Sequence, residues 1–249
     1  IFLTVFLFSS CAVSYPKETL HDDIKRLVKK ESGLDCTVTK INTTIYLDME
    51  MNELISTDQD VVGKAINAIQ TAVFTITRVA LSSDDEIKII VVTAYDPDYN
   101  IALKMFQNID DVKSYFYQRI SRGDYEQRQL LEIQGPADAR MSVEDKHHVT
   151  QEEYVARLIV SQINMTGKKN PVLGSLINNL QLRYGYIKGG ILYIFSKPAQ
   201  DFSGIEVLLK KMISNELVKN LKKYSISSIK SAIILTEDLK VVFEVPADL

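Results

Sequence analysis

The sequence is poor in the residues from which disulfide scaffolds and many metal sites are built. It has two cysteines and three histidines among 249 residues. Two cysteines cannot make a disulfide framework, and three histidines with no paired-ligand motif give little support to metal-dependent hydrolysis. The sequence also lacks a glycine-rich phosphate loop between a strand and a helix, and a serine in a nucleophile elbow. We therefore expect no metal and no cofactor, and a binding or scaffolding protein rather than an enzyme.

Long hydrophobic runs are also missing, except for a short one at the start. Residues 1–8 are apolar or nearly so, but a membrane-spanning helix needs about 20 such residues. Ser9, Ser10 and Cys11 follow, which is typical of the end of a lipoprotein signal peptide, where the cysteine thiol carries the lipid. The alternative is a buried strand with an incidental cysteine. We expect a lipid on Cys11, and the following Ala12-Val13 favours the periplasmic face of the outer membrane.

Overall composition is ordinary for a globular chain, but charge is unevenly distributed. Hydrophobic residues make up 46% and charged residues 24%, and the length suits one large domain or two small ones. Residues 168–230 contain eleven basic and three acidic residues, although the whole chain has a formal net charge of -3. Such asymmetry is typical of a surface that meets an anionic partner.

Hydrophobic patterns predict the same order of elements twice. Each half has two β-branched or alternating runs around a turn, a long amphipathic helix, and two further runs around a turn. The first copy is predicted as strands within 37–51, a helix over 58–81, and strands over 86–95 and 101–106. The second copy is predicted as strands over 182–187 and 191–195, a helix over 203–224, and strands over 229–235 and 240–245.

These elements predict an α+β fold of two ββαββ two-layer modules, joined by helices. In each module we expect an antiparallel sheet with a helix on one face. The segment after Gly135-Pro136 has mixed charges and no apolar period, which predicts a linker. We expect a signal remnant with the lipid-attachment cysteine over 1–11, a tether and short helix over 12–33, the first module with a helical extension over 34–135, the linker over 136–149, and the second module with its preceding helices over 150–249.

The densest polar cluster is the run from Arg119 to Arg128. In its pattern Ile120-Ser121-Arg122, then Asp124-Tyr125 and Arg128, the sequence resembles uncharacterised predicted bacterial lipoproteins with ββαββ organisation. Those proteins carry an Ile-Ser-Arg-x-(Asp/Glu)-Tyr-x-x-Arg run after the second hairpin. The resemblance extends over about residues 37–133. It implies an exported, lipid-anchored family and no particular reaction.

Four charged residues of this run, Arg119, Arg122, Asp124 and Arg128, could act together. Arginine binds carboxylates at two points, so we expect an ion-pair lattice that holds a helix–loop–helix corner on the sheet. An anion-binding corner is the functional alternative. The helix over 203–224 provides a second basic surface, because Lys211, Lys219 and Lys222 lie opposite its apolar face. A solvated face is the simplest role for these lysines, and contact with anionic headgroups or a cell-wall polymer is the functional one.

His147 and His148 lie in the predicted linker, near Glu144 and Asp145. Adjacent side chains rarely converge on one metal, so we expect a solvated loop. The rival hypothesis is an enzyme acting on envelope material, with both histidines, Arg122 and Asp124 near one cleft. A subunit of a secretion or surface assembly is a third hypothesis. We expect a membrane contact through the lipid, an envelope protein or anionic polymer as partner, and no nucleic acid.

Overall fold

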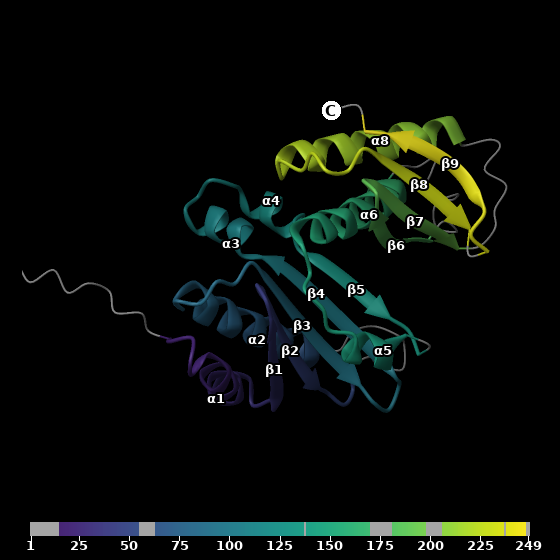
Figure 1. Ribbon diagram of the computed structural model, residues 1–249. Helices are drawn as coiled ribbons and strands as arrows, with labels where there is room; N and C mark the ends of the chain where they lie inside the picture. Colours follow the sequence, from purple (N-terminus) through teal and green to yellow (C-terminus); the bar gives the residue numbers. More distant parts are fainter. Residues whose placement is uncertain are drawn as a thin grey trace, which may run out of the picture. The chain divides into compact units, whose positions relative to one another are not determined.

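The computed structural model describes residues 15–54, 63–136, 138–169, 181–197, 206–236 and 238–247. Within them the chain divides into two compact units, each with its own sheet (Figure 1). The first unit comprises 15–121 and 131–148, and the second comprises 122–130 and 149–247. The expected α+β class, with two modules of strands and helix, is confirmed. Cys11 lies outside the described residues.

The first unit has a five-stranded sheet, with α1 and α2 on one face and α5 on the other (Figure 1). Its elements are α1 (Leu20–Ser32), β1 (Cys36–Ile41), β2 (Thr44–Glu50), α2 (Gly63–Leu81), β3 (Ile89–Asp96), β4 (Ile101–Asn108), α3 (Ile109–Phe116), β5 (Leu130–Gln134) and α5 (Ala139–Glu144).

The second unit has a four-stranded sheet and three described helices. Its elements are α4 (Arg122–Glu126), α6 (Gln151–Lys169), β6 (Gln181–Lys188), β7 (Ile191–Lys197), α8 (Glu206–Lys223), β8 (Ser231–Thr236) and β9 (Val241–Pro246). The expected start of the last helix at Ser203 lies outside the described residues.

Strand direction differs from the expectation in the middle of both sheets. The order is β1-β2-β3-β4-β5 in one sheet and β6-β7-β8-β9 in the other. The outer pairs β1/β2, β3/β4, β6/β7 and β8/β9 are antiparallel, as expected, but β2/β3 and β7/β8 are parallel. The prediction of wholly antiparallel sheets was therefore wrong. A helix carries the chain back between the two central strands, so both strands run the same way.

The boundaries of the two units also differ from the expected ones in the part of the chain after β4. Residues 122–130 belong to the second unit, and 130–134, which we expected within a helical extension, form the edge strand β5. Leu130 is buried whereas Leu131 and Ile133 are exposed, which is the two-residue period of a strand. The expected linker over 136–149 contains the helix α5.

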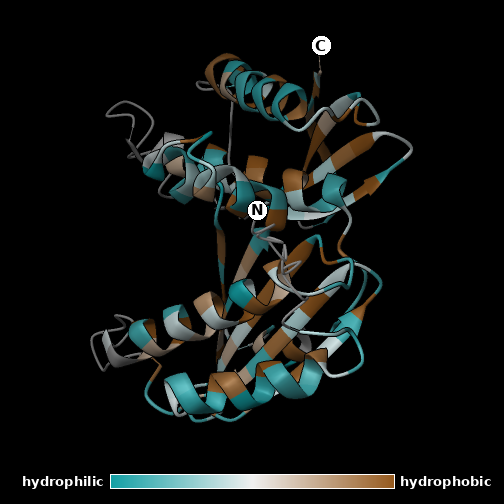
Figure 2. Ribbon diagram, turned by 90° about the vertical axis from the view of Figure 1, so that its left-hand side faces the viewer, coloured by the Kyte–Doolittle hydropathy of each residue, from teal (hydrophilic) through white to brown (hydrophobic). Residues whose placement is uncertain are grey.

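The core of the first unit lies between the sheet and the helices α1 and α2. The helices show alternating apolar and polar residues in Figure 2, and the apolar residues of α1 recur at helical spacing. Gly33 ends α1 in the left-handed conformation, with φ of 76°, and its N–H donates to the Lys29 carbonyl. Burying one leucine or isoleucine side chain contributes about 1.5–3 kcal/mol. The main contributors are Leu20, Ile24 and Val28 of α1, Ile69, Ala72 and Ile76 of α2, and Leu47, Met49, Ile90 and Val92 of the strands.

A polar clamp fixes the end of α1 to the carboxy-terminal part of α2. The Glu31 carboxylate accepts hydrogen bonds from Thr75 Oγ1 and from Arg78 Nη2, each at 2.5 Å. The bonds from Thr75 and then Arg78 lower the pKa of Glu31 below its ordinary value. The clamp therefore sets the position of α1 along α2.

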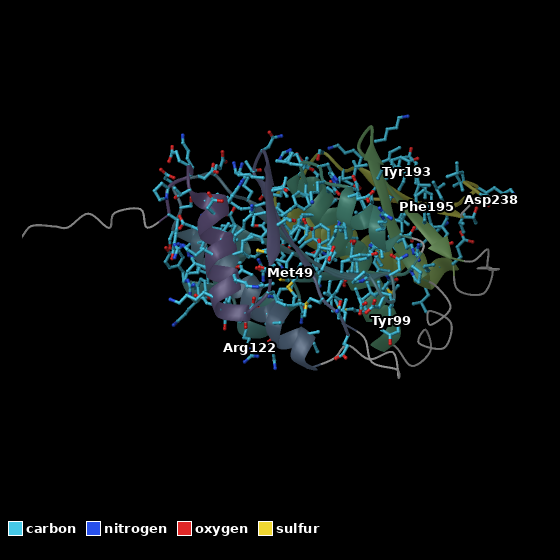
Figure 3. All side chains as sticks on the ribbon, turned by 90° about the horizontal axis from the view of Figure 1, so that it is seen from below. Met49, Tyr99, Arg122, Tyr193, Phe195 and Asp238 are labelled. Atoms are coloured by element: carbon cyan, nitrogen blue, oxygen red, sulfur yellow. The ribbon has the colours of Figure 1, made fainter. Side chains whose placement is uncertain are left out.

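One face of the second sheet is core and the other carries aromatic rings. Leu192 and Ile194 are fully buried on the face toward the helices. Alternation along the strands puts Tyr186, Tyr193 and Phe195 on the opposite face. Figure 3 labels two of these side chains, Tyr193 and Phe195 on β7. Tyr186 stacks on Tyr193 with ring centroids 4.6 Å apart and lies 6.3 Å from the Phe195 ring.

This aromatic cluster depends on a glycine. The pairing of β6 with β7 shifts register between Tyr184 and Tyr186, and Gly185 lies at the shift. A Cβ atom at Gly185 would lie 2.6 Å from Phe195 Cε2 and 2.8 Å from the Tyr193 carbonyl oxygen. The Phe195 ring therefore occupies the space that a side chain at this position would need.

We predict that Gly185→Ala lowers the free energy of unfolding by about 1–3 kcal/mol, because the methyl group overpacks a site bounded by backbone. Urea unfolding of the full chain measures the change. Gly135→Ala is the matched control, since nothing lies within 4 Å of a Cβ there. Equal stability of the two variants would contradict the close approach.

Candidate functional site

A cavity lies among α4, α6 and α8 of the second unit. Its volume is about 400 Å³, and it opens broadly to solvent. Part of the conspicuous polar run lines it, but through residues other than the four predicted ones. The lining residues are Gly123, Glu126, Gln127, Gln129, Gln162, Met165, Glu216 and Lys219.

Side chains of α6 hold the residues after α4 beside the cavity by bonding to their backbone carbonyl oxygens. Thr150 caps α6, accepting a hydrogen bond from the Glu153 N–H at 3.1 Å, as the Thr-x-x-Glu spacing predicts. The buried Tyr154, one turn into α6, donates its hydroxyl proton to the Arg128 carbonyl oxygen. Gln162, further along α6, donates from Nε2 to the Gln127 carbonyl oxygen at 3.2 Å. These bonds fix one wall of the cavity.

One lining residue of the cavity, Gln162, is buried and is hydrogen-bonded to a second buried amide, Asn220, which does not line the cavity. Gln162 is 6% exposed, and its Oε1 accepts a hydrogen bond from Asn220 Nδ2 of α8 at 2.9 Å. Asn220 Nδ2 also donates to the Glu216 carbonyl oxygen at 2.8 Å. These bonds hold the Nδ2 group of Asn220 and the Oε1 atom of Gln162 in place, while Asn220 Oδ1 is buried without a hydrogen-bond partner among the described residues.

The rim of the cavity carries charges of both signs, and they are paired. Glu126 Oε1 lies 2.7 Å from Arg122 Nε, and Glu216 Oε2 lies 3.2 Å from Lys219 Nζ. Both pairs are at least partly exposed, so each contributes about 0–1 kcal/mol to stability. Their larger effect is to orient carboxylate oxygens and an ammonium group among the residues that line the cavity.

The four residues of the predicted polar corner are divided between the units. Arg119 belongs to the first unit, where its guanidinium lies 5.5 Å from the Tyr117 ring centroid. Arg122 and Asp124 are exposed on α4 in the second unit. Arg128 follows α4 and lies 6.0 Å from the ring centroid of Tyr224, beyond the end of α8. The anion-binding role of this corner stays a prediction.

The predicted lysine face of α8 is exposed, as its periodicity indicates. The three lysines Lys211, Lys219 and Lys222 are exposed, whereas the apolar side chains on the opposite side, among them Leu209 and Ile213, are buried. Lys219 pairs with Glu216 and lines the cavity. Contact of this face with an anionic surface stays a prediction.

Sequence reasoning missed the glutamines that line the cavity. Gln127 lies inside the polar run and Gln129 directly follows it, but the chemistry predicted for that run involves its charged residues alone. Gln162 continues the apolar stripe of Leu158 and Ile159, so a polar residue on a buried helical face was the available signal.

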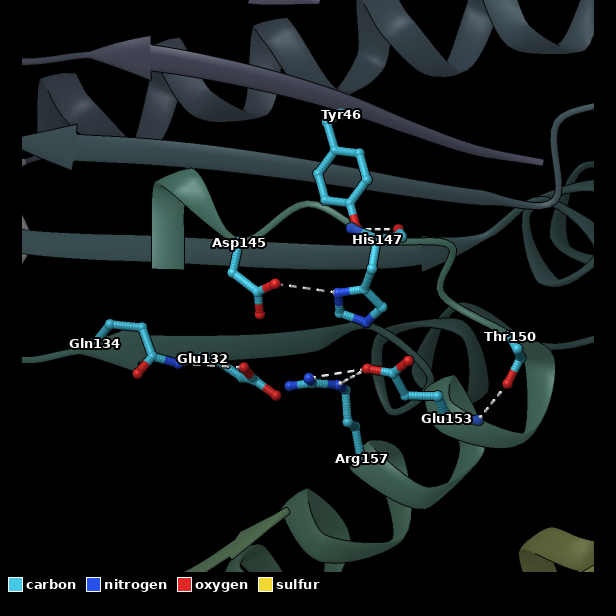
Figure 4. A network of polar contacts seen from close by, with 8 residues as sticks. All are labelled: Tyr46, Glu132, Gln134, Asp145, His147, Thr150, Glu153 and Arg157. Carbon is cyan, nitrogen blue, oxygen red and sulfur yellow. Dashed lines mark hydrogen bonds and ion pairs between the residues drawn. The ribbon is translucent and has the colours of Figure 1, made fainter. Parts of the chain in front are cut away.

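The two histidines lie in a segment bound to the first sheet, which we call the strap and define as residues 145–148 (Figure 4). Tyr46 Oη donates to the His147 carbonyl oxygen at 2.6 Å and accepts from the His147 N–H at 3.2 Å. A hydrogen bond of 3.1 Å joins His148 Nε2 to Thr43 Oγ1. The segment is a loop, as expected, but residues 146–148 are half-buried rather than fully solvated, because side chains of β2 and of the preceding turn bind the strap.

An ion pair adds to the attachment of the strap. Lys146 Nζ lies 2.9 Å from Asp48 Oδ2, and the Asp48 side chain is only 10% exposed. Tyr46 and Asp48 lie two apart on β2, so both point to the face that the strap covers. His147 also lies 3.7 Å from Asp145 through its Nδ1.

We predict that Tyr46→Phe lowers the free energy of unfolding by about 1 kcal/mol and speeds hydrogen exchange of the His147 amide, since it removes the acceptor of that amide. Hydrogen exchange followed by mass spectrometry measures the effect on residues 145–148. Tyr99→Phe, at an exposed tyrosine of the same unit, is the control. Unchanged exchange in Tyr46→Phe would show that the strap is held by other contacts.

Comparison with family models, curated proteins and solved structures finds no match for this chain. Among the described residues, no group of three or more histidine, cysteine, aspartate or glutamate side chains is placed to hold a metal ion. No helix in the described ranges combines the length and apolarity that crossing a membrane requires.

Proposed function

We propose that this chain is a cell-envelope binding protein, held at a membrane by a lipid on Cys11, that takes a small polar ligand into the cavity among α4, α6 and α8. The cavity is the observation that carries the binding role. The apolar run before Cys11 and the resemblance of the polar run to predicted lipoproteins support the location, and Ala12-Val13 favours the periplasmic face of the outer membrane.

The cavity suits recognition because its polar groups are held in place before a ligand arrives. Gln162 is fixed by bonds to Gln127 and Asn220, so binding need not order it. Glu126 and Glu216 are each oriented by a cation. An envelope location also gives the exposed Lys211 and Lys222 a plausible partner, since each basic residue near an anionic surface contributes about 1 kcal/mol.

We expect the chain, expressed from its own gene in a bacterial host, to incorporate a fatty-acid probe and to sediment with membranes. Cys11→Ala should lose both, because it removes the acylated thiol. Cys36→Ala is the matched control and should keep the label, since Cys36 is a half-buried residue of β1 whose thiol pKa is raised by burial. Label retained in Cys11→Ala would refute the anchor.

For the cavity, we expect a library of small polar fragments, screened by ligand-observed NMR, to yield binders that Met165→Trp displaces. Met165 lines the cavity and is 39% exposed, so a larger side chain there fills the space. Leu208→Trp is the control, at a 40% exposed position of α8 outside the lining. No binder, or equal binding to the two variants, would refute the binding role.

A further inference from the structure

The groups that line the cavity include both hydrogen-bond donors and acceptors. Gln127 and Gln129 each have an amide with two N–H donors and an acceptor oxygen, whereas Gln162 is buried and already uses its Oε1 and Nε2 atoms in bonds to Asn220 and to the Gln127 backbone. Lys219 adds an ammonium donor, and Glu126 and Glu216 add carboxylate acceptors. A carboxylate has about four acceptor positions, so one ion pair leaves positions for a ligand.

This mixture disfavours ligands with strong charge. An anion in the cavity would meet the carboxylates of Glu126 and Glu216, and a polycation would meet Lys219. Both carboxylates already have a partner cation, at 2.7 Å and 3.2 Å. A charged ligand would therefore have to break an existing pair or approach a like charge.

Hydroxyl groups avoid this conflict, because each one donates once and accepts twice. Neighbouring hydroxyls on a ring match the paired donor and acceptor of an amide, and the two oxygens of a carboxylate. Met165, with a polarizable thioether, supplies an apolar surface for the C–H face of such a ring. A volume of about 400 Å³ limits the ligand to about one or two rings.

We infer that the cavity binds a neutral, hydroxyl-rich saccharide of one or two rings. The inference rests on the proposed binding function and names the ligand class of the same site. The buried Gln162–Asn220 pair holds one side of the cavity in place, and the amides of Gln127 and Gln129, the glutamates and Lys219 meet the hydroxyl groups of the sugar.

The test is isothermal titration calorimetry of the full chain with N,N′-diacetylchitobiose and with maltose. Inorganic phosphate and spermidine serve as the negatively and positively charged competitors. We expect at least one saccharide to bind and neither charged probe to compete with it. Gln129→Ala should weaken saccharide binding about threefold to tenfold, the effect of losing one or two hydrogen bonds. Lys219→Ala should weaken it similarly, and Lys211→Ala, on the same helix outside the lining, should leave it unchanged.

Several outcomes would overturn the inference. They are binding of neither saccharide, competition by phosphate or spermidine, and saccharide binding that Gln129→Ala leaves intact. If polar fragments bind the cavity while both saccharides fail, the ligand class is wrong and the binding role stands. If nothing occupies the cavity, both the ligand class and the proposed function fail.

Discussion

Each unit depends on one pair of parallel strands joined by a helix. In the first unit β2 and β3 run together through α2, and in the second β7 and β8 run together through α8. Because the connecting helix must cover one face of its sheet, it decides which side of every strand becomes core. The remaining strands pair on the outer sides of the two parallel strands. Each further element of a unit then packs on one face of its sheet or the other.

The face away from the connecting helix is used differently in the two units. In the first, α5 and the strap lie there, bound through Tyr46, Asp48 and Thr43. In the second, that face carries the stacked rings of Tyr186 and Tyr193, with Phe195 over Gly185. The cavity belongs to neither sheet face, since α4, α6 and α8 form it. The two sheets therefore carry different surfaces on the faces away from their connecting helices, and helices form the cavity.

Much of this fold could be predicted because hydrophobic periodicity is a local property. The spacing of Leu20, Ile24 and Val28 predicts a helix, and Gly189-Gly190 predicts a hairpin, without knowledge of the rest of the chain. Strand direction was missed because it depends on where the chain returns after a helix. The strap was missed because Tyr46 and His147 are 101 positions apart. The cavity was missed for a related reason, because buried amides such as Gln162 and Asn220 come together only in the folded chain.

The path of the backbone between the units has a consequence for how the chain can be divided. It passes from one unit to the other after residues 121, 130 and 148, so β5, α5 and the strap come later in the sequence than part of the second unit. A fragment that ends at residue 121 would leave β4 as a bare edge and β2 without its covering segment. A single proteolytic cut after residue 121 would leave β5 paired with β4 and the strap bound to Tyr46 and Asp48, so the two products would stay associated through these contacts. The units are compact, yet they are not separable segments of the gene.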